Sequence, residues 1–334
     1  MLFSIILLVV SLGGILVAAE LFTNGIEWFG RRLRLGEGAV GSVLAAVGTA
    51  LPETTIAIVA VVIGGKAHTE AGIGAILGAP MMLSTLAMFV TGAAVIVFAR
   101  LGVRSTTMVV DHRVLGRDLR SFFLVYLVAM MAAFVPARAG RIAIGIFLLG
   151  AYALYVRRTF TDGSAVSHGQ ELGPLHFHRK APEPRLPAIA VQVLAALGLM
   201  VLGAKAFLVG VTTIAATVGI SPLVLSVVIT PIATELPEKF NSITWVRRKK
   251  DTLALGNISG ALVFQSSVTP AIGIFFTAWR LEREALASIV IAVVAASIAW
   301  AEMTWRKRLS PYSLLIGGLL YALYPIYVFG ILHR

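Results

Sequence analysis

The chain has 334 residues, of which 58% are hydrophobic and only 13% are charged, and its mean hydropathy is +0.91. This composition excludes an ordinary soluble domain and indicates an integral membrane protein. The net charge of +12 comes from Lys and Arg residues in short segments between apolar stretches, which is typical of membrane topology and not of a nucleic-acid-binding surface. The absence of cysteine excludes disulfides and thiolate metal sites.

Apolar stretches long enough to cross a hydrocarbon core about 30 Å thick recur along the whole chain. We therefore expect an all-α integral membrane protein with ten transmembrane helices. The predicted spans are residues 2–28, 38–63, 69–99, 120–136, 141–157, 186–212, 221–246, 251–279, 284–303 and 311–332.

Basic residues alternate between the segments that connect these spans. Twenty of the 28 Lys and Arg residues follow the first, third, fifth, seventh and ninth spans, and six lie on the other side. By the positive-inside rule the first set faces the cytoplasm, so we expect both termini outside. The longest connection, residues 158–184, is polar and rich in Gly and Pro, and it predicts a mobile cytoplasmic linker between two five-span halves, 1–157 and 185–334.

Three histidines, His168, His176 and His178, lie in this linker. The last two have a spacing at which both imidazoles could bind one metal ion. Solvated loop histidines are the more common case, and we favour that interpretation.

The two halves resemble each other in sequence. Shifting the first half by 185 positions, without a gap, aligns Thr49 with Thr234 and Glu53 with Glu238. Because an odd number of spans separates the copies, they enter the membrane in opposite directions. Inverted repeats are typical of transporters whose binding site opens alternately to the two sides of the membrane.

The motif GTALPE of the second span and the motif ATELPE of the seventh each place a proline directly before a glutamate. A proline removes a backbone donor and clashes with the preceding turn, so we expect both helices to be broken near mid-membrane. The freed carbonyls, the hydroxyls of Thr49 and Thr234 and the carboxylates of Glu53 and Glu238 form an all-oxygen ligand set. Such a set suits a hard cation such as calcium or sodium.

With these motifs the chain resembles the sodium/calcium exchanger superfamily of cation antiporters. Proteins of this superfamily carry a Gly-Thr-Ser-x-Pro-Glu type of motif in the second and seventh of ten helices, within two repeats. The resemblance covers most of both halves and implies that Glu53 and Glu238 coordinate calcium. The further ligands that it implies are the side chains of Thr49 and Thr234 and the carbonyls of Ala46 and Pro231.

The chain also departs from the pattern of this superfamily. Ala50 and Glu235 stand where Ser is common, so one ligand is lost and a third carboxylate is gained. The runs 78–83 and 260–265 stand where a Gly-Ser-Asn-x-x-Asn pattern usually contributes to sodium sites, and only Gln265 keeps a polar ligand. Sodium coupling is therefore not implied by the resemblance alone.

Lys239 is a candidate charge partner in the seventh span. It follows Glu238 and lies four residues after Glu235, so its ammonium can neutralise that carboxylate on one helical face. In the alternative interpretation, the ammonium enters a vacated sodium site and replaces the counter-ion.

Three more polar residues lie within predicted spans. Glu20 and Lys205 occupy matching positions of the two repeats, and Glu20 suits a structural ion pair and the lining of an ion path equally well. Asn257 makes the eighth span more polar than the third, which suits either the ion path or the packing of helices.

Together these features predict a secondary antiporter that exports calcium in exchange for sodium or protons by alternating access. Its partners would be inorganic cations, with no cofactor, and its location a bacterial inner membrane. The alternative is a proton-coupled or sodium-independent transporter of another cation. A cation channel and a membrane enzyme remain weaker interpretations: deep carboxylates in inverted repeats favour a site closed alternately to each side, and HExxH and GxSxG motifs are absent from the sequence.

Overall fold

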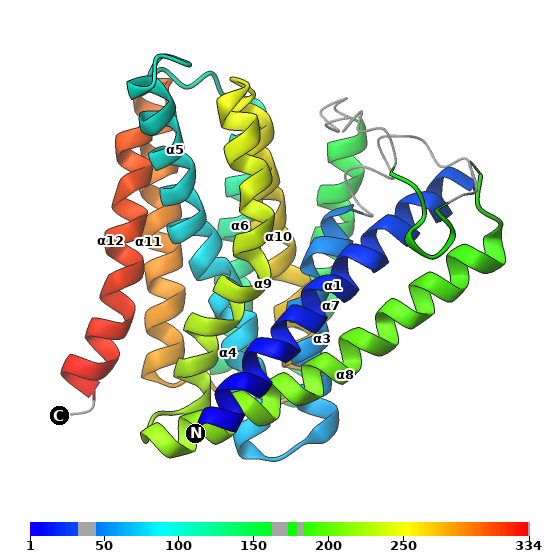
Figure 1. Cartoon of the computed structure of the whole chain (residues 1–334). Coiled ribbons are helices and arrows are strands. Elements are labelled where there is room, and N and C mark those ends of the chain that lie inside the picture. The colour runs from blue at the N-terminus through cyan, green and yellow to red at the C-terminus, as the bar shows by residue number, and fades with distance from the viewer. Residues whose placement is uncertain (33–44, 162–172, 180–182, 333–334) are drawn as a thin grey trace.

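The computed structural model describes residues 1–32, 45–161, 173–179 and 183–332, which form helices joined by short segments (Figure 1). The prediction of an all-helical membrane protein is confirmed over these residues. The helices are α1 (Leu2–Arg32), α3 (Ala45–Ile63), α4 (Lys66–Met82), α5 (Met88–Arg100), α6 (His112–Met131), α7 (Arg138–Thr161), α8 (Leu186–Val218), α9 (Pro222–Arg247), α10 (Asp251–Phe276), α11 (Arg283–Arg306) and α12 (Pro311–Tyr327). Short turns of other helical types are η2 (Leu83–Ala87), η3 (Ala132–Phe134), η4 (His176–His178) and η5 (Val328–Leu332).

Seven segments of the described residues are long and apolar enough to cross a membrane, judged by length and composition. They are Leu2–Arg32, Lys66–Arg100, Arg138–Thr159, Leu186–Val218, Asp251–Phe276, Arg283–Arg306 and Pro311–Gly330. Shorter apolar helices, Ala50–Ile63 and Pro222–Glu235, lie within α3 and α9.

Each predicted span overlaps a helix of the described residues, and the fourth differs most in its bounds. Helix α6 begins at His112 and not at residue 120. The reason is a cap that the hydropathy pattern does not show: the carboxylate of Asp111 accepts the backbone N–H of Arg113 at 2.8 Å.

Figure 1 shows α1 and α8 as a long tilted pair beside a more upright group of helices that includes α5, α6, α10, α11 and α12. Small residues let α1 and α8 approach closely, because a Cβ added to Gly25 would come within 2.7 Å of Cγ2 of Val193. The two ends of the chain lie at the same end of the molecule in this view.

The predicted breaks in the second and seventh helices are wrong. Helix α3 continues through Pro52, and α9 continues through Pro231 and Pro237. A proline removes only one backbone hydrogen bond, and the remaining bonds keep the segment helical where no water can replace them. Threonine hydroxyls also satisfy backbone carbonyls in both helices, as Thr54 does for Ala50 at 2.7 Å.

Helix α4 packs directly onto the backbone of α9. A Cβ added to Gly74 would come within 2.5 Å of the carbonyl oxygen of Leu223, and one added to Gly78 would come within 2.8 Å of Cγ of Pro231 and closer still to the carbonyl oxygen of Val227. The Val227 carbonyl is the one that would accept from residue 231 in a regular helix, and Pro231 has no N–H to donate. The glycines of α4 therefore lie against the part of α9 that contains Pro231, where one backbone hydrogen bond is missing.

The segment between α5 and α6 is held on the start of α10 by a buried ion pair. The guanidinium of Arg104 binds both carboxylate oxygens of Asp251, at 2.6 and 2.8 Å, and also donates to the carbonyl of Val246 at 2.8 Å. The backbone N–H of Val109 donates to Asp251 at 2.9 Å. This network joins the ends of α9 and α10 to the loop before α6.

Residues 173–179 of the linker are held against α1 and α8. The indole N–H of Trp28 donates to the carbonyl of Gly173 at 2.9 Å, and the carboxamide oxygen of Gln192 accepts the N–H of Phe177 at 2.9 Å. Leu175 is fully buried beside Trp28. This part of the linker is therefore not the mobile segment that its composition predicts, because its backbone finds fixed partners on two helices.

Candidate functional site

Glu53 lies on α3, at the centre of the packing. Helix α3 contacts α1, α4, α8, α9 and α10. The side chain of Glu53 is 0% exposed, as are those of Ala50 and Ile56 on the same helix. The carboxylate that the sequence predicts as a cation ligand is therefore buried inside the helix bundle.

Glu235 lies on α9, which contacts α3, and its side chain is 1% exposed. The carboxamide nitrogen of Gln265 on α10 donates to Oε1 of Glu235 at 3.1 Å. The oxygen of the same carboxamide has no hydrogen-bond partner among the described residues. Two of the predicted ligands, on different helices, are thus in contact, and a buried amide oxygen remains available to a ligand.

A stripe of hydroxyl groups continues along the buried face of α9. Ser226, Thr230 and Thr234 have exposed fractions of 1% or less. The hydroxyl of Thr234 donates to the carbonyl of Thr230 at 2.8 Å, the hydroxyls of Ser226 and Thr230 lie 2.8 Å apart, and Ser226 donates to the carbonyl of Ala71 on α4 at 2.7 Å. Ser226 and Thr230 were not among the predicted residues, although Ser226, Thr230 and Thr234 follow one another at intervals of four residues, which is a signal of a shared helical face.

Several predicted ligands have side chains outside the described residues. Thr49 and Ala46 belong to α3, and Glu238 and Lys239 belong to α9, but only their helical backbone is described. The juxtaposition of Glu238 with Glu53 and the partner of Lys239 therefore stay predictions. Pro231, whose carbonyl is a further predicted ligand, is buried within α9.

Four described side chains of α3, α9 and α10 carry oxygen atoms that could act as ligands: the carboxylates of Glu53 and Glu235, the amide oxygen of Gln265 and the hydroxyl of Thr234. Oxygen ligands of this kind suit hard cations. No group of three or more His, Asp or Glu side chains that could hold a metal ion occurs among the residues that the structure describes.

The sequence profile of the family described as "Sodium/calcium exchanger protein" matches residues 3–161 and 188–332. The chain belongs to this family. The resemblance inferred from the proline-glutamate motifs is thereby confirmed. This is a family of transporters and not of enzymes.

Known proteins resemble this exchanger-family chain over nearly its full length. CaxA of Alkalimonas amylolytica is 26% identical, over 92% of this chain and 91% of its own. In fold, the crystal structure of the H+/Ca2+ exchanger CAX matches with a TM-score of 0.73 at 16% identity, covering 98% of this chain and 82% of that one. The sodium-calcium exchanger NCX_Mj matches with a TM-score of 0.58 at 20% identity, covering 99% of both chains.

In this exchanger-family protein, the run 78–83 is an apolar part of the core. Ala79, Met81, Met82 and Leu83 are each 0% exposed. The nearest hydroxyl after this run, that of Ser84, donates to the carbonyls of Pro80 and Met81 within its own helical segment. The third span therefore offers no side-chain oxygen between residues 78 and 83.

Glu20 and Lys205 lie on the outer surface of the α1–α8 pair and not in the buried part of the protein. Both residues are exposed. Glu20 lies 3.6 Å from Nε2 of His176 in the linker. Asn257 of α10 is half-buried. These positions support a peripheral role for Glu20 and Lys205, and they leave the predicted role of Asn257 open.

The predicted histidine metal site is only partly within the described residues. His168 lies outside them, whereas His176 and His178 form the short turn η4. Nδ1 of His176 lies 3.4 Å from the guanidinium of Arg179. No metal-binding cluster includes these histidines among the residues described.

Proposed function

We propose that this protein is a secondary antiporter that moves calcium across the membrane in exchange for sodium or protons, by alternating access. The observation that carries the proposal is the carboxylate of Glu53, fully buried on the central helix α3 of an exchanger-family protein. An ionised glutamate within the membrane carries a free-energy penalty of at least about 2.5 to 3.5 kcal/mol, which a bound cation, a proton or a neighbouring opposite charge can offset.

The proposed ligands are contributed by the two helices that carry the proline-glutamate motifs and by α10. Glu53 and Glu238 form the principal pair. The contact between Glu235 and Gln265 supports a place for both residues beside this pair. The remaining proposed ligands are Thr49, Thr234 and the carbonyls of Ala46 and Pro231.

We further infer that the chain has ten transmembrane helices in two inverted five-helix repeats, residues 1–157 and 185–334, with 158–184 as a cytoplasmic linker. The overlap of the predicted spans with described helices supports this arrangement, as does the position of both chain ends at one end of the molecule (Figure 1). The excess of basic residues assigns the opposite end to the cytoplasm, so both termini face outside a bacterial inner membrane.

The direction and the counter-ion are part of the same proposal. Exchange of calcium for sodium or protons is supported by the likeness to an H+/Ca2+ exchanger and to a sodium-calcium exchanger, and we infer that calcium moves outward against the inward flow of the counter-ion. The apolar run 78–83 favours a second candidate, a proton-coupled or sodium-independent transporter of another cation, because it removes the oxygen ligands of a sodium site.

Ion flux into liposomes that contain the purified protein tests these proposals. We expect uptake of labelled calcium to require an imposed sodium or proton gradient, and whichever gradient drives it identifies the counter-ion. Uptake without either gradient would instead indicate a channel. Strontium and manganese, tested in parallel, would identify a transporter of another cation.

Two variants assign the site. Glu53→Gln removes a buried negative charge with little change in shape, and we expect it to abolish uptake, whereas Glu20→Gln on the exposed surface of α1 should retain it. Uptake by Glu53→Gln at the wild-type rate would refute the proposed site.

Lys239→Ser tests the interpretation in which the ammonium replaces a sodium ion. If that interpretation is correct, the folded variant gains a sodium dependence that the wild type lacks. If the ammonium only neutralises Glu235, the sodium dependence stays as it is and the free energy of unfolding decreases.

A further inference from the structure

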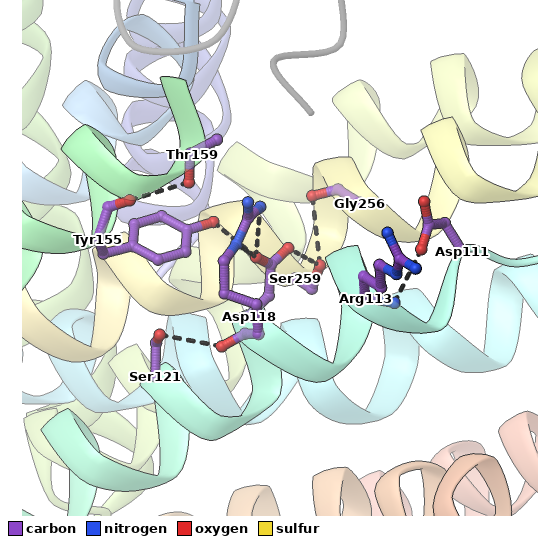
Figure 2. Close-up of polar contacts among 9 residues, drawn as sticks. Asp111, Arg113, Asp118, Ser121, Tyr155, Thr159, Gly256 and Ser259 are labelled. Carbon is purple, nitrogen blue, oxygen red and sulfur yellow. Dashed lines mark hydrogen bonds and ion pairs between the residues drawn. The ribbon is translucent and has the colours of Figure 1, made fainter. Parts of the chain in front are cut away.

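Asp118 of α6 is a buried carboxylate at which three helices meet, apart from the residues proposed to bind calcium. Its side chain is 2% exposed. The hydroxyl of Ser259 on α10 donates to Oδ2 at 2.6 Å, and the hydroxyl of Tyr155 on α7 donates to Oδ1 at 3.0 Å. Arg117, on the same helix, donates to Oδ1 at 3.0 Å. Figure 2 shows the side chains of Tyr155 and Ser259 on either side of Asp118.

The donors around Asp118 differ in kind from those around the other buried aspartate, Asp251. Asp251 accepts only N–H donors in the described structure, from the guanidinium of Arg104 and the backbone of Val109. An N–H group cannot accept a hydrogen bond, so a protonated Asp251 would have no acceptor for its proton among these partners. The partners of Asp251 in the described structure are therefore donors only.

Hydroxyl groups can donate or accept, because the O–H bond rotates. A proton on Oδ2 of Asp118 would therefore find an acceptor in Oγ of Ser259. The Ser259 hydroxyl then has a second acceptor, the carbonyl of Gly256, at 3.4 Å. Tyr155 and Arg117 continue to donate to Oδ1 in either state. Every hydrogen-bonding group of the cluster can thus be satisfied with or without a proton on Asp118.

We propose that Asp118 is a proton-binding site, separate from the carboxylates on α3 and α9, whose occupancy controls how firmly α10 is held. A proton from cytoplasmic water joins the carboxylate to give a carboxylic acid, and no other bond is made or broken. The role in transport rests on the proposed function, in which the proton is one of two candidate counter-ions.

Few charged groups surround Asp118. The side chain of Arg117 is 18% exposed, so one partner of Asp118 reaches the surface. Helix α6 packs against α7, α10 and α11. Among the described residues, the groups that act on Asp118 are Arg117 on its own helix, Tyr155 on α7 and the neutral hydroxyl of Ser259 on α10. On α11, the carboxylate of Glu302 accepts from the N–H of Ser310 and the hydroxyl of Ser313.

Protonation changes the link between α6 and α10. A hydroxyl that donates to a carboxylate makes a charge-assisted bond, which is roughly twice as strong as a bond between neutral groups. Binding a proton converts the Ser259–Asp118 bond from the first kind to the second. Gln265 lies six residues further along α10, about 9 Å at 1.5 Å per residue, and contacts Glu235. A proton on Asp118 therefore loosens the helix that carries a proposed ligand.

Infrared spectroscopy tests proton binding without measuring transport. As the pH of the purified protein is lowered, a protonated carboxyl gives a C=O stretching band, and we expect Asp118→Asn to lack one such band. Tyr155→Phe should shift the frequency of this band, because a hydrogen bond to the C=O group is lost. Ser121→Ala is the matched control, since its hydroxyl donates to the carbonyl of Arg117 within α6.

The same variants then test the role in transport. Asparagine can donate to Ser259 as a protonated Asp118 does, so Asp118→Asn should retain calcium flux and lose one step of its dependence on cytoplasmic pH. Glu53→Gln should lose flux and keep the infrared band of Asp118, so failure of the proposed function is distinguishable. Identical carboxyl bands in wild type and Asp118→Asn would overturn the proposal. If Asp118→Asn does not fold, an unshifted carboxyl band in Tyr155→Phe would overturn the proposal instead.

Discussion

Arg104 and Asp251 form a buried bidentate ion pair between the loop before α6 and the first residue of α10, with side chains only 2% and 1% exposed. Removing one partner leaves the other charge buried and uncompensated. We therefore expect Arg104→Ala and Asp251→Ala each to lower the free energy of unfolding by about 3 to 5 kcal/mol. Thermal unfolding in detergent measures this loss.

The control for this prediction is the exposed pair between Arg32 and Glu183, whose side chains are 39% and 69% exposed. Arg32→Ala should change stability by at most about 1 kcal/mol. Replacing both buried partners, in the double variant Arg104→Met with Asp251→Leu, should lower the free energy of unfolding less than either alanine variant does. Equal, small losses at both pairs would show that the buried pair does not hold α10.

Gln265 is predicted to stabilise Glu235 in the binding-competent arrangement. Gln265→Met keeps the size of the side chain and removes a donor to the buried carboxylate, so we expect a loss of about 1 to 3 kcal/mol in stability and a higher calcium concentration for half-maximal uptake. Ser267→Ala is the control on the same helix, because its hydroxyl bonds only backbone carbonyls of α10. Unchanged calcium dependence in Gln265→Met would remove this residue from the site.

Gly78 sets the distance between α4 and the part of α9 around Pro231. The Cβ of Gly78→Ala would come within 2.8 Å of Pro231, so one helix must move, and we expect a loss of about 1 to 3 kcal/mol with reduced calcium uptake. Gly198→Ala, on α8, places its Cβ in open space and should stabilise the protein by about 0.5 to 1 kcal/mol. Equal effects of the two variants on thermal unfolding would contradict the close contact.

Gln192 is predicted to hold the linker on the helix pair. Its carboxamide donates to the carbonyl of Leu21 and to Asn24 on α1, each at 2.9 Å, and accepts from Phe177 in the linker. Gln192→Leu leaves these buried partners unsatisfied, so we expect trypsin to cut after Arg179 faster than in the wild type. The exposed variant Val191→Ala should leave the rate of cleavage unchanged. A rate of cleavage unaffected by Gln192→Leu would contradict the prediction, because it would show that the linker stays on α1 and α8 without Gln192.

The proline motifs predicted some features of the protein correctly and others wrongly. They indicated the family and two acidic residues, one of which, Glu53, is fully buried. They also predicted broken helices, and this prediction is wrong. A proline removes one backbone hydrogen bond, whereas breaking the helix would leave several more backbone groups unpaired inside the membrane, which is less favourable.

Other contacts had no sequence signal that could locate them. Ser259 lies two residues after Asn257 in the eighth span, and its hydroxyl donates to Asp118 of α6. Arg104 follows the third span and was considered only as one of the basic residues that indicate the cytoplasmic side. Its side chain is almost fully buried in an ion pair. Both outcomes depend on which helix lies opposite, a property that the composition of a single segment does not contain.

The sequence by itself determined the membrane location, the helical class and the family, because hydropathy over a span and a duplicated motif are properties of contiguous residues. Only the tertiary structure decided that Gln265 contacts Glu235, that Ser259 and Tyr155 meet at Asp118, and that Arg104 reaches Asp251. Helices that are apolar on most of their surface carry little periodicity to indicate which face meets which neighbour, so their rotation and pairing follow from close packing and from the pairing of the few buried polar groups.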